Sequence, residues 1–181
     1  MINNHFDLAA LVGKQAYHYL LLADNAYRKA EKSNLFDPTL HNPAKCLSLS
    51  GSIDSLRREE LTYCILAVIL FQSMMEKIPV FVPTIGSGME LTKKSKFAPA
   101  WEDLISRITD SVDKSAAKSV FAQYKEEIYW NMRLPIVHGK EKIDLDKINS
   151  IRITDVYAGF RKGWEAYDYL LKEVFAPEQA H

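Results

Sequence analysis

Apolar residues recur every three or four positions over residues 5–32, which is the period of an α-helix with one buried face. Asn4 precedes this stretch and Asp7 lies three positions later, so the pair can cap the start of the helix. The pattern therefore predicts a first amphipathic helix over residues 5–32. Its expected buried stripe consists of Leu8, Val12, Ala16, Tyr19, Ala23, Ala26 and Ala30.

A second helix is expected over residues 53–78, after a stretch at residues 33–52 whose prolines, glycine, asparagines and serines predict a long loop. The first turns of this helix are charged, but its middle is apolar on every side, which is typical of a central helix that packs against several neighbours. The apolar run at residues 61–71 is too short to span a membrane. Pro79 is expected to end the helix.

Three more apolar patterns predict helices in the second half of the chain. One helix is expected to begin near Pro99, after an irregular stretch at residues 80–98. The next would be capped by Asp113 or Ser115 and run toward Arg133. A short helical turn or loop at residues 144–152 follows. The last helix would be capped by Thr154 or Asp155 and end near Phe175. The expected buried faces are Trp101, Leu104, Ile105, Ile108 and Val112 in the first helix, Ala117, Val120, Phe121, Tyr124, Ile128 and Met132 in the second, and Val156, Phe160, Trp164, Tyr167, Leu171 and Val174 in the third.

These patterns predict an all-α bundle of about five main helices, because no stretch of the chain alternates as a strand does. The length of 181 residues suits one domain, in which residues 1–52 form a helix and a loop packed on a bundle of residues 53–175. The 53–78 helix is expected near the centre.

Composition and charge limit the kinds of ligand and cofactor that the chain is expected to bind. Lys and Arg together number 23, as do Asp and Glu, so the whole chain has no net attraction for a polyanion and any RNA contact must come from a local patch. Lys93, Lys94 and Lys96 form the densest basic cluster and are the first candidates for phosphate contact. Two cysteines without metal-ligand spacing favour free thiols in a reducing cytoplasm. No clustered metal ligands or Gly-rich phosphate loop point to a metal or cofactor.

The main chemical candidates lie in residues 126–142. Pro135 is expected to break the preceding helix near Arg133 and to form a rigid kink, anchored by Ile136 and Val137, with His138 beyond it. Arginine can bind two phosphate oxygens at once, and histidine titrates near neutral pH. The structural alternative is that Arg133 and His138 only satisfy a helix C-terminus.

Four further residues could support this pair, and two of them have a structural alternative. Glu126 could orient Arg133 or neutralise it in a salt bridge. Asn131 could bind a ligand or cap the kink. Lys140 and Lys142 add positive charge beside His138, where they could contact RNA.

The segment Arg133-Leu134-Pro135-Ile136-Val137-His138-Gly139 resembles the signature of HEPN domains, an Arg followed after four to six residues by His and often Gly. A helix that ends in Met74-Met75-Glu76-Lys77 and a helix that carries Trp101 precede it in the family's order, so the resemblance covers about residues 53–175. It implies a dimeric, all-α fold. It also implies metal-independent RNA cleavage in toxin–antitoxin, CRISPR or other defence systems, with Arg133 and His138 as catalytic residues. In such chains an acid near Glu76 can lie close to the Arg, although Glu76 can equally be a solvated carboxylate.

Two functions follow from the resemblance. The first is a metal-independent endoribonuclease. The second is a catalytically inactive HEPN-like dimerisation module that binds RNA or a protein partner such as an antitoxin. Leu134, which stands where family members often have Asn or Asp, favours the second, as do the neutral charge and the N-terminal extension. In both cases the resemblance implies a homodimer with residues 133–142 at or beside the two-fold interface.

Overall fold

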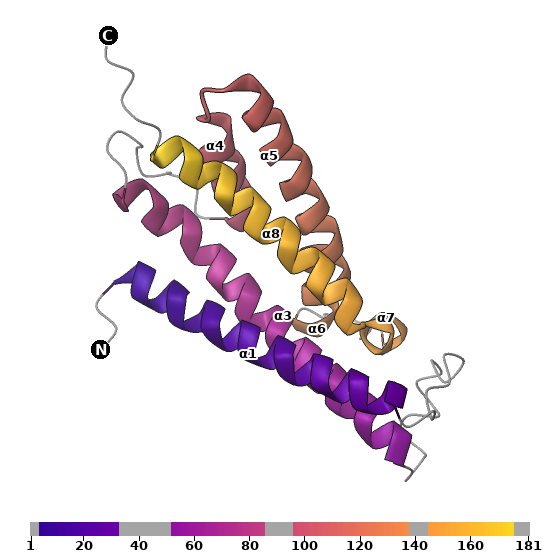
Figure 1. The fold of residues 1–181 in the computed structure, drawn as a ribbon. Coiled ribbons are helices and arrows are strands. Elements are labelled where there is room, and N and C mark those ends of the chain that lie inside the picture. The colour runs from indigo at the N-terminus through magenta and orange to yellow at the C-terminus, as the bar shows by residue number, and fades with distance from the viewer. Residues whose placement is uncertain (1–3, 33–51, 86–95, 138–144, 176–181) are drawn as a thin grey trace.

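The computed structural model describes residues 4–32, 52–85, 96–137 and 145–175. Within these residues the protein is all-α and contains no strand. The long rods α1, α3, α5 and α8 run side by side, with α4 at one end of the bundle and α6 and α7 at the other (Figure 1). This confirms the predicted all-α class. The predicted loop at residues 33–52 lies outside the described part, apart from Ser52.

The first helix, α1 (His5–Lys32), has the predicted bounds. The Asp7 N–H donates to Asn4 Oδ1 at 2.8 Å, which confirms the predicted cap. Of the predicted stripe, four alanines are fully buried and the larger residues are partly exposed. Small side chains on this face let α1 approach α3 closely, as at Gly13, where an added Cβ would lie 2.6 Å from Met74 Sδ.

The central helix, α3 (Ser52–Ile85), is longer than predicted, because Pro79 and Pro83 lie inside it. Pro79 has no N–H, so the carbonyl of Met75, four residues earlier, loses its helical donor. The indole N–H of Trp101 donates to this carbonyl at 2.9 Å. The prediction that Pro79 ends the helix was therefore wrong, because a side chain from another helix replaces the missing donor.

The remaining helices are α4 (Phe97–Ser106), α5 (Ser111–Tyr124), the π-helix η1 (Lys125–Arg133), α6 (Leu134–Val137), α7 (Leu145–Ser150) and α8 (Ile153–Val174). The predicted caps of two helices were wrong. Asp110 caps α5 and accepts from two backbone N–H groups, and α8 begins after Arg152, which makes no side-chain cap. The expected irregular stretch at residues 80–98 is helical up to Ile85 and again from Phe97.

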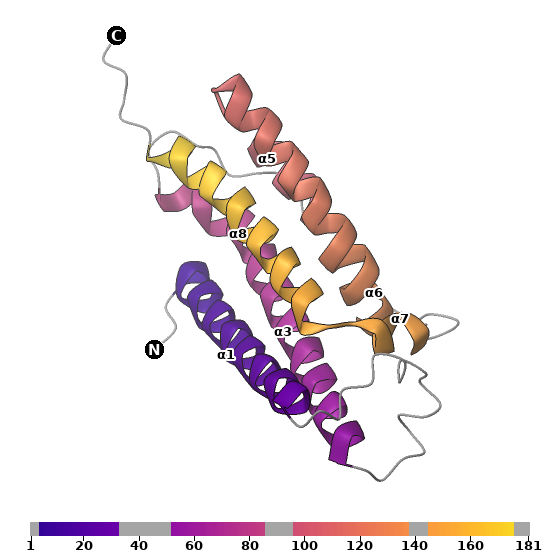
Figure 2. The same ribbon diagram turned by 45° about the vertical axis from the view of Figure 1, so that its right-hand side comes forward.

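The core lies between α3 and the helices α1, α4, η1 and α8 that contact it, and between α8 and α5 (Figure 2). Phe71 of α3 stacks on Phe160 of α8 with ring centroids 3.9 Å apart. Gly163 lets α8 approach, since an added Cβ would lie 2.7 Å from the Phe71 ring. Trp101 is fully buried, as expected of a core residue.

Two residues of the predicted buried stripes are exposed. Val112 lies in the first turn of α5 with 73% of its surface exposed, because α5 starts at Ser111, two to four residues before the predicted caps. Trp164 is 43% exposed, although the centroids of its ring and the Phe71 ring lie 5.9 Å apart.

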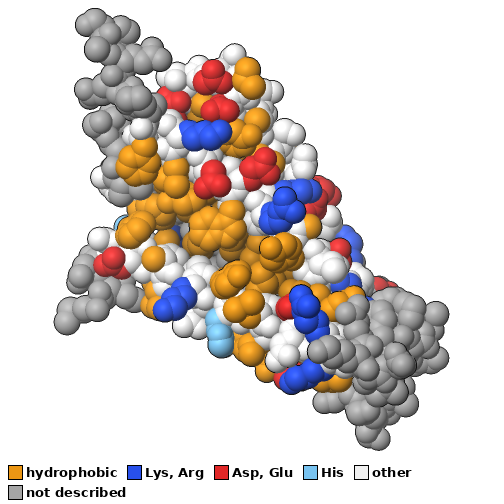
Figure 3. Space-filling model, in the orientation of Figure 1, with side chains coloured by type: hydrophobic (Ala, Val, Ile, Leu, Met, Phe, Trp, Pro, Cys, Tyr) orange, Lys and Arg blue, Asp and Glu red, His pale blue; other side chains and the backbone are white. Residues whose placement is uncertain are grey.

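Figure 3 shows one face of the molecule, on which apolar side chains gather over α1 and α8. The large exposed apolar residues of the two helices are Phe6, Leu11, Tyr17, Leu21, Tyr157 and Trp164.

Residues Leu56–Thr84 of α3 are long and apolar enough to cross a membrane, judged by length and composition. In the fold, 56% of the most apolar window of this helix is buried against other helices. The same properties belong to the core helix of a globular bundle, which is the role predicted for this helix from its pattern.

Candidate functional site

Arg133 is positioned by a change of helical register. The helix that starts at Ser111 is α-helical to Tyr124, π-helical over Lys125–Arg133 and α-helical again from Leu134 to Val137. The Leu134 N–H donates to the Tyr129 carbonyl, and the next residue, Pro135, has no N–H to continue the ladder. The predicted break at Arg133 was therefore wrong, because the chain widens into a π-helix and stays helical. π-Helical turns are rare and occur often at functional sites.

The kink residues also differ from expectation. Ile136 packs against the core cluster, as predicted, but Val137 is 45% exposed. Leu134 is partly buried beside Arg133.

The guanidinium of Arg133 lies between an acid and an aromatic ring. Its Nη2 is 3.4 Å from Glu76 Oε1 of α3, and its Cζ lies over the Tyr129 ring, 5.5 Å from the ring centroid. The Arg133 side chain is 18% exposed and that of Glu76 is 36% exposed. The pair therefore lies at the edge of the bundle, where a solvent-borne anion can approach it.

Two hydrogen bonds link Tyr124, Gln72 and Glu76 and hold the Glu76 carboxylate in place. The Tyr124 hydroxyl donates to Gln72 Oε1 at 2.7 Å, and Gln72 Nε2 donates to Glu76 Oε1 at 3.2 Å. Burial raises the pKa of the Tyr124 hydroxyl well above its ordinary value. The Glu76 charge acts in the same direction and the Arg133 charge opposes it. Tyr124 therefore stays a protonated donor, and the order Tyr124–Gln72–Glu76–Arg133 fixes the carboxylate beside the guanidinium.

Of the other residues predicted for the site, three lie within the described residues and five lie outside them. Asn131 and Glu126 are exposed on η1, where Asn131 Nδ2 donates to Glu126 Oε1 at 3.4 Å. Within the described ranges, the acid paired with Arg133 is Glu76, and Glu126 forms no ion pair with it. Lys96 is exposed and directly precedes α4. The predicted site residues His138, Lys93, Lys94, Lys140 and Lys142 lie outside the described residues.

Sequence reasoning assigned no role in the site to Gln72, Tyr124, Tyr129 or Trp130. Gln72 and Glu76 had a detectable signal, since two polar residues four apart at the end of an apolar run lie on one face of a helix. Tyr124 had none, because its position in the buried stripe is that of an ordinary core aromatic. Trp130 carries a signal that was overlooked, namely a large apolar residue off the buried stripe of a charged segment.

A separate hollow of about 470 Å³ lies between η1, α7 and α8. Its polar lining includes the carboxylates of Glu127 and Asp155 and a single lysine, Lys147. Glu127 also pairs with Lys162. Two carboxylates disfavour a phosphate in this hollow, and Arg133 does not line it, so the hollow is not the anion site.

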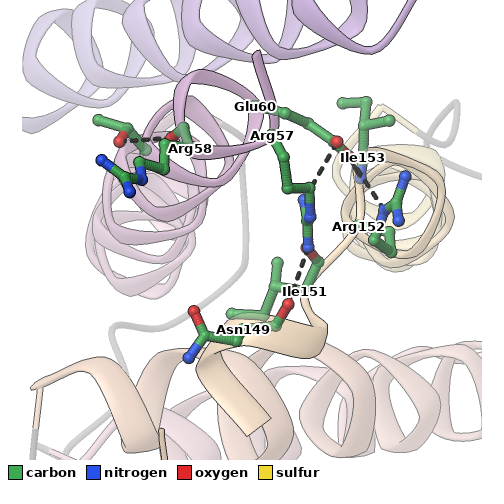
Figure 4. A network of polar contacts seen from close by, with 8 residues as sticks. Arg57, Arg58, Glu60, Asn149, Ile151, Arg152 and Ile153 are labelled. Carbon is green, nitrogen blue, oxygen red and sulfur yellow. Dashed lines mark hydrogen bonds and ion pairs between the residues drawn. The ribbon is translucent and has the colours of Figure 1, made fainter. Parts of the chain in front are cut away.

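A second charged cluster ties the start of α3 to the linker between α7 and α8 (Figure 4). Glu60, 1% exposed, accepts from the Ile153 N–H and lies 3.1 Å from Arg57 and 3.3 Å from Arg152. Arg57 also donates to the carbonyls of Asn149 and Ile151 at 2.8 and 2.7 Å. These contacts are directed inward and to the backbone, so the cluster is structural. Over the described residues, no group of His, Cys, Asp and Glu could hold a metal ion.

Comparison with protein-family models gives no match, and neither a curated protein nor a solved structure is significantly similar to the chain. The similarity of residues 133–139 to the HEPN signature thus stands on the motif and on the order of the helices around it.

Proposed function

We propose that the protein is a HEPN-like metal-independent endoribonuclease, with Arg133 and His138 as its catalytic pair. The observation that carries the proposal is the setting of Arg133. A buried polar chain fixes its partner Glu76, and its side chain lies at the edge of the fold, five positions before His138. The role in a toxin–antitoxin or other defence system belongs to the same proposal.

The proposed reaction needs the RNA, two protein groups and solvent water, which makes the proton transfer that His138 does not make. The ribose 2′-oxygen attacks the adjacent phosphorus and the bond from phosphorus to the 5′-oxygen breaks, which leaves a 2′,3′-cyclic phosphate and a free 5′-hydroxyl. His138 either accepts the 2′-hydroxyl proton or supplies the proton to the leaving 5′-oxygen. Arg133 stabilises the charge on the phosphorane-like transition state. Arginine has five N–H donors, so the contact with Glu76 leaves donors for phosphate oxygens.

The proposal includes a homodimer that brings two such sites together. The outward ridge of α3 that contains Glu76 supports it, because apolar residues at helical spacing along this ridge are only partly buried. Covering them with a second copy would place Arg133 beside a two-fold axis. The ridge consists of Ile65, Ile69, Ser73, Glu76 and Val80.

The second candidate is a catalytically inactive HEPN-like dimerisation module that binds RNA or a protein partner. The low exposure of Arg133, 18%, and its ion pair favour this function, because a guanidinium in a structural pair binds phosphate less strongly. Leu134 beside it supplies no polar group to the site.

Cleavage of single-stranded RNA in EDTA tests the first function. Wild-type protein should form 2′,3′-cyclic phosphate ends or their 3′-phosphate hydrolysis products, and DNA should survive because it has no 2′-hydroxyl. His138→Ala should abolish cleavage and keep RNA binding, whereas Arg133→Ala should reduce both. His18→Ala and Arg161→Ala, which change exposed residues on α1 and α8, are matched controls and should cleave normally. Cleavage that requires Mg²⁺ or survives His138→Ala would contradict the mechanism.

Two further variants separate the candidates and map the binding surface. If the wild-type protein binds RNA without cutting it, Leu134→Asn tests whether a missing polar neighbour inactivated the site. Replacing Lys93, Lys94 and Lys96 together by Ala should weaken RNA binding and flatten its salt dependence without changing the cleavage of bound RNA. Light scattering of Ile69→Glu against wild type tests the dimer, which the charge should dissociate if the α3 ridge is the interface.

A further inference from the structure

Trp130 is the large apolar side chain that η1 exposes to solvent, with 53% of its surface accessible. The residues around it on the helix, Lys125, Glu126, Glu127 and Asn131, are polar or charged. The buried face of η1 is formed by Ile128 and Met132 instead, so Trp130 contributes little to the core. A tryptophan held out on a charged helix is typical of a surface that binds a ligand.

The Trp130 ring is connected to Arg133 through Tyr129. The Tyr129 and Trp130 rings meet edge to face, with centroids 5.3 Å apart and an interplanar angle of 83°. The Tyr129 ring also lies against Phe97 of α4, with ring centroids 5.3 Å apart, and the Arg133 guanidinium lies over it. Tyr129 is therefore fixed on several sides and supports the indole from its edge.

We propose that Trp130, supported by Tyr129, is a stacking platform for one base of a single-stranded RNA whose phosphate contacts Arg133. This inference rests on the proposed function for its RNA ligand and extends it to a base-binding subsite. Every base has a face that can stack on an aromatic ring, so the platform is tolerant of sequence.

The charges around Trp130 favour different positions for the phosphate and for the base of a nucleotide. The exposed carboxylate of Glu126, four residues before Trp130, repels a phosphate from the indole. Arg133, whose guanidinium lies over the Tyr129 ring, attracts a phosphate. The Asn131 amide, next to Trp130, makes one bond to Glu126 among the described residues, so its carbonyl oxygen and second N–H suit a base edge. A nucleotide with its phosphate at Arg133 and its base on Trp130 satisfies this arrangement of charges.

RNA affinities in a His138→Ala background test the platform without cleavage, using a fluorescent single-stranded oligoribonucleotide of mixed sequence. Trp130→Ala should weaken binding about tenfold, because it removes the aromatic ring on which the base stacks. Trp130→Phe should retain most of the affinity. Trp164→Ala changes an exposed tryptophan of α8 and should bind as the parent does. With an oligomer that carries abasic sites throughout, Trp130→Ala and its parent should bind equally.

The outcomes distinguish the platform from the proposed nuclease. Trp130→Ala that binds RNA as its parent does would overturn the platform and leave the nuclease standing. Weaker binding by Trp130→Ala combined with no cleavage by wild-type protein would support the platform and reject the nuclease. Trp130→Ala that dissociates the oligomer in light scattering and keeps its RNA affinity would assign Trp130 to a protein interface and overturn the platform. A wild-type protein that binds no RNA overturns both.

Discussion

Glu76 and Arg133, 57 positions apart in the chain, lie side by side with 3.4 Å between Oε1 and Nη2. The contact joins the central helix α3 to the C-terminal end of the π-helix η1. It makes the arginine of the motif part of an ion pair whose acid is itself held by Gln72. An anion that bound Arg133 would have to compete with this carboxylate.

Replacing Glu76 by Gln should therefore strengthen RNA binding. The amide keeps the shape and the contact with Gln72, but it no longer offsets the charge of Arg133. Stability should change by less than about 1 kcal/mol, because the pair is partly exposed. The measurement is RNA affinity by fluorescence anisotropy at several salt concentrations. Glu102→Gln, which removes the acid from the surface pair with Lys125, is the control and should leave RNA affinity unchanged. Weaker binding by Glu76→Gln would mean that the carboxylate orients Arg133 for the ligand.

The indole of Trp101 should matter more when residue 79 is proline. Trp101→Phe leaves the Met75 carbonyl without its donor and should lower the free energy of unfolding by about 1–3 kcal/mol. Pro79→Ala restores a backbone N–H that can bond to the same carbonyl, so Trp101→Phe should cost less in that background. Urea unfolding of the two single variants and the double variant measures the coupling. Equal costs in both backgrounds would show that the indole bond does not compensate for Pro79.

Gly163→Ala should destabilise the packing of α8 on α3. The added methyl group would lie 2.7 Å from Phe71 Cε1 and 3.1 Å from Tyr124 Cδ2, and both rings are buried. Overpacking of this kind costs about 1–3 kcal/mol, more than the gain in helix propensity of about 0.5–1 kcal/mol. Thermal unfolding of Gly163→Ala is compared with that of Glu165→Ala, an exposed change on the same helix. A Gly163→Ala protein as stable as the wild type would show that α8 can shift.

The thiol of Cys64 should make stability depend on alkaline pH. Burial raises its pKa from 9.0 to about 12, and the Glu60 charge adds to this. As pH rises above 9, the unfolded chain loses the thiol proton first, so the folded state binds more protons and the free energy of unfolding falls. In a Cys46→Ser background, the stability advantage over the further variant Cys64→Ala should shrink between pH 9 and 11. Urea unfolding at several pH values checks this. An advantage that stays constant with pH would contradict the shift.

The sequence predicted elements whose signals are local and missed those that depend on another helix. The bounds of α1 follow from Asn4, Asp7 and an uninterrupted stripe, all within one segment. The extension of α3 past Pro79 depends on Trp101, which is 26 positions from Met75. No rule about proline in a single helix includes a donor from elsewhere.

The candidate site was predictable to a similar extent. The resemblance implied Arg133 and allowed an acid near Glu76 to lie close to it, and Glu76 does lie beside Arg133. The Tyr124–Gln72 bond was not predictable, because Tyr124 has the same spacing as the core aromatics around it. The π-register of η1 was not predictable either, since Pro135 allows both a break and a widened turn.

The π-helix sets the direction in which Arg133 points. Its hydrogen bonds join residues five apart instead of four, so each residue of Lys125–Arg133 turns the chain by a smaller angle than in an α-helix. A chain that stayed α-helical from Ser111 onward would keep Phe121 and Tyr124 in the core and yet rotate Arg133 around the helix, away from Glu76. Deleting one residue from this segment would therefore change the direction of Arg133 more than it would change the length of the helix. The wide turn lets one continuous helix serve both the core and the surface that carries the arginine.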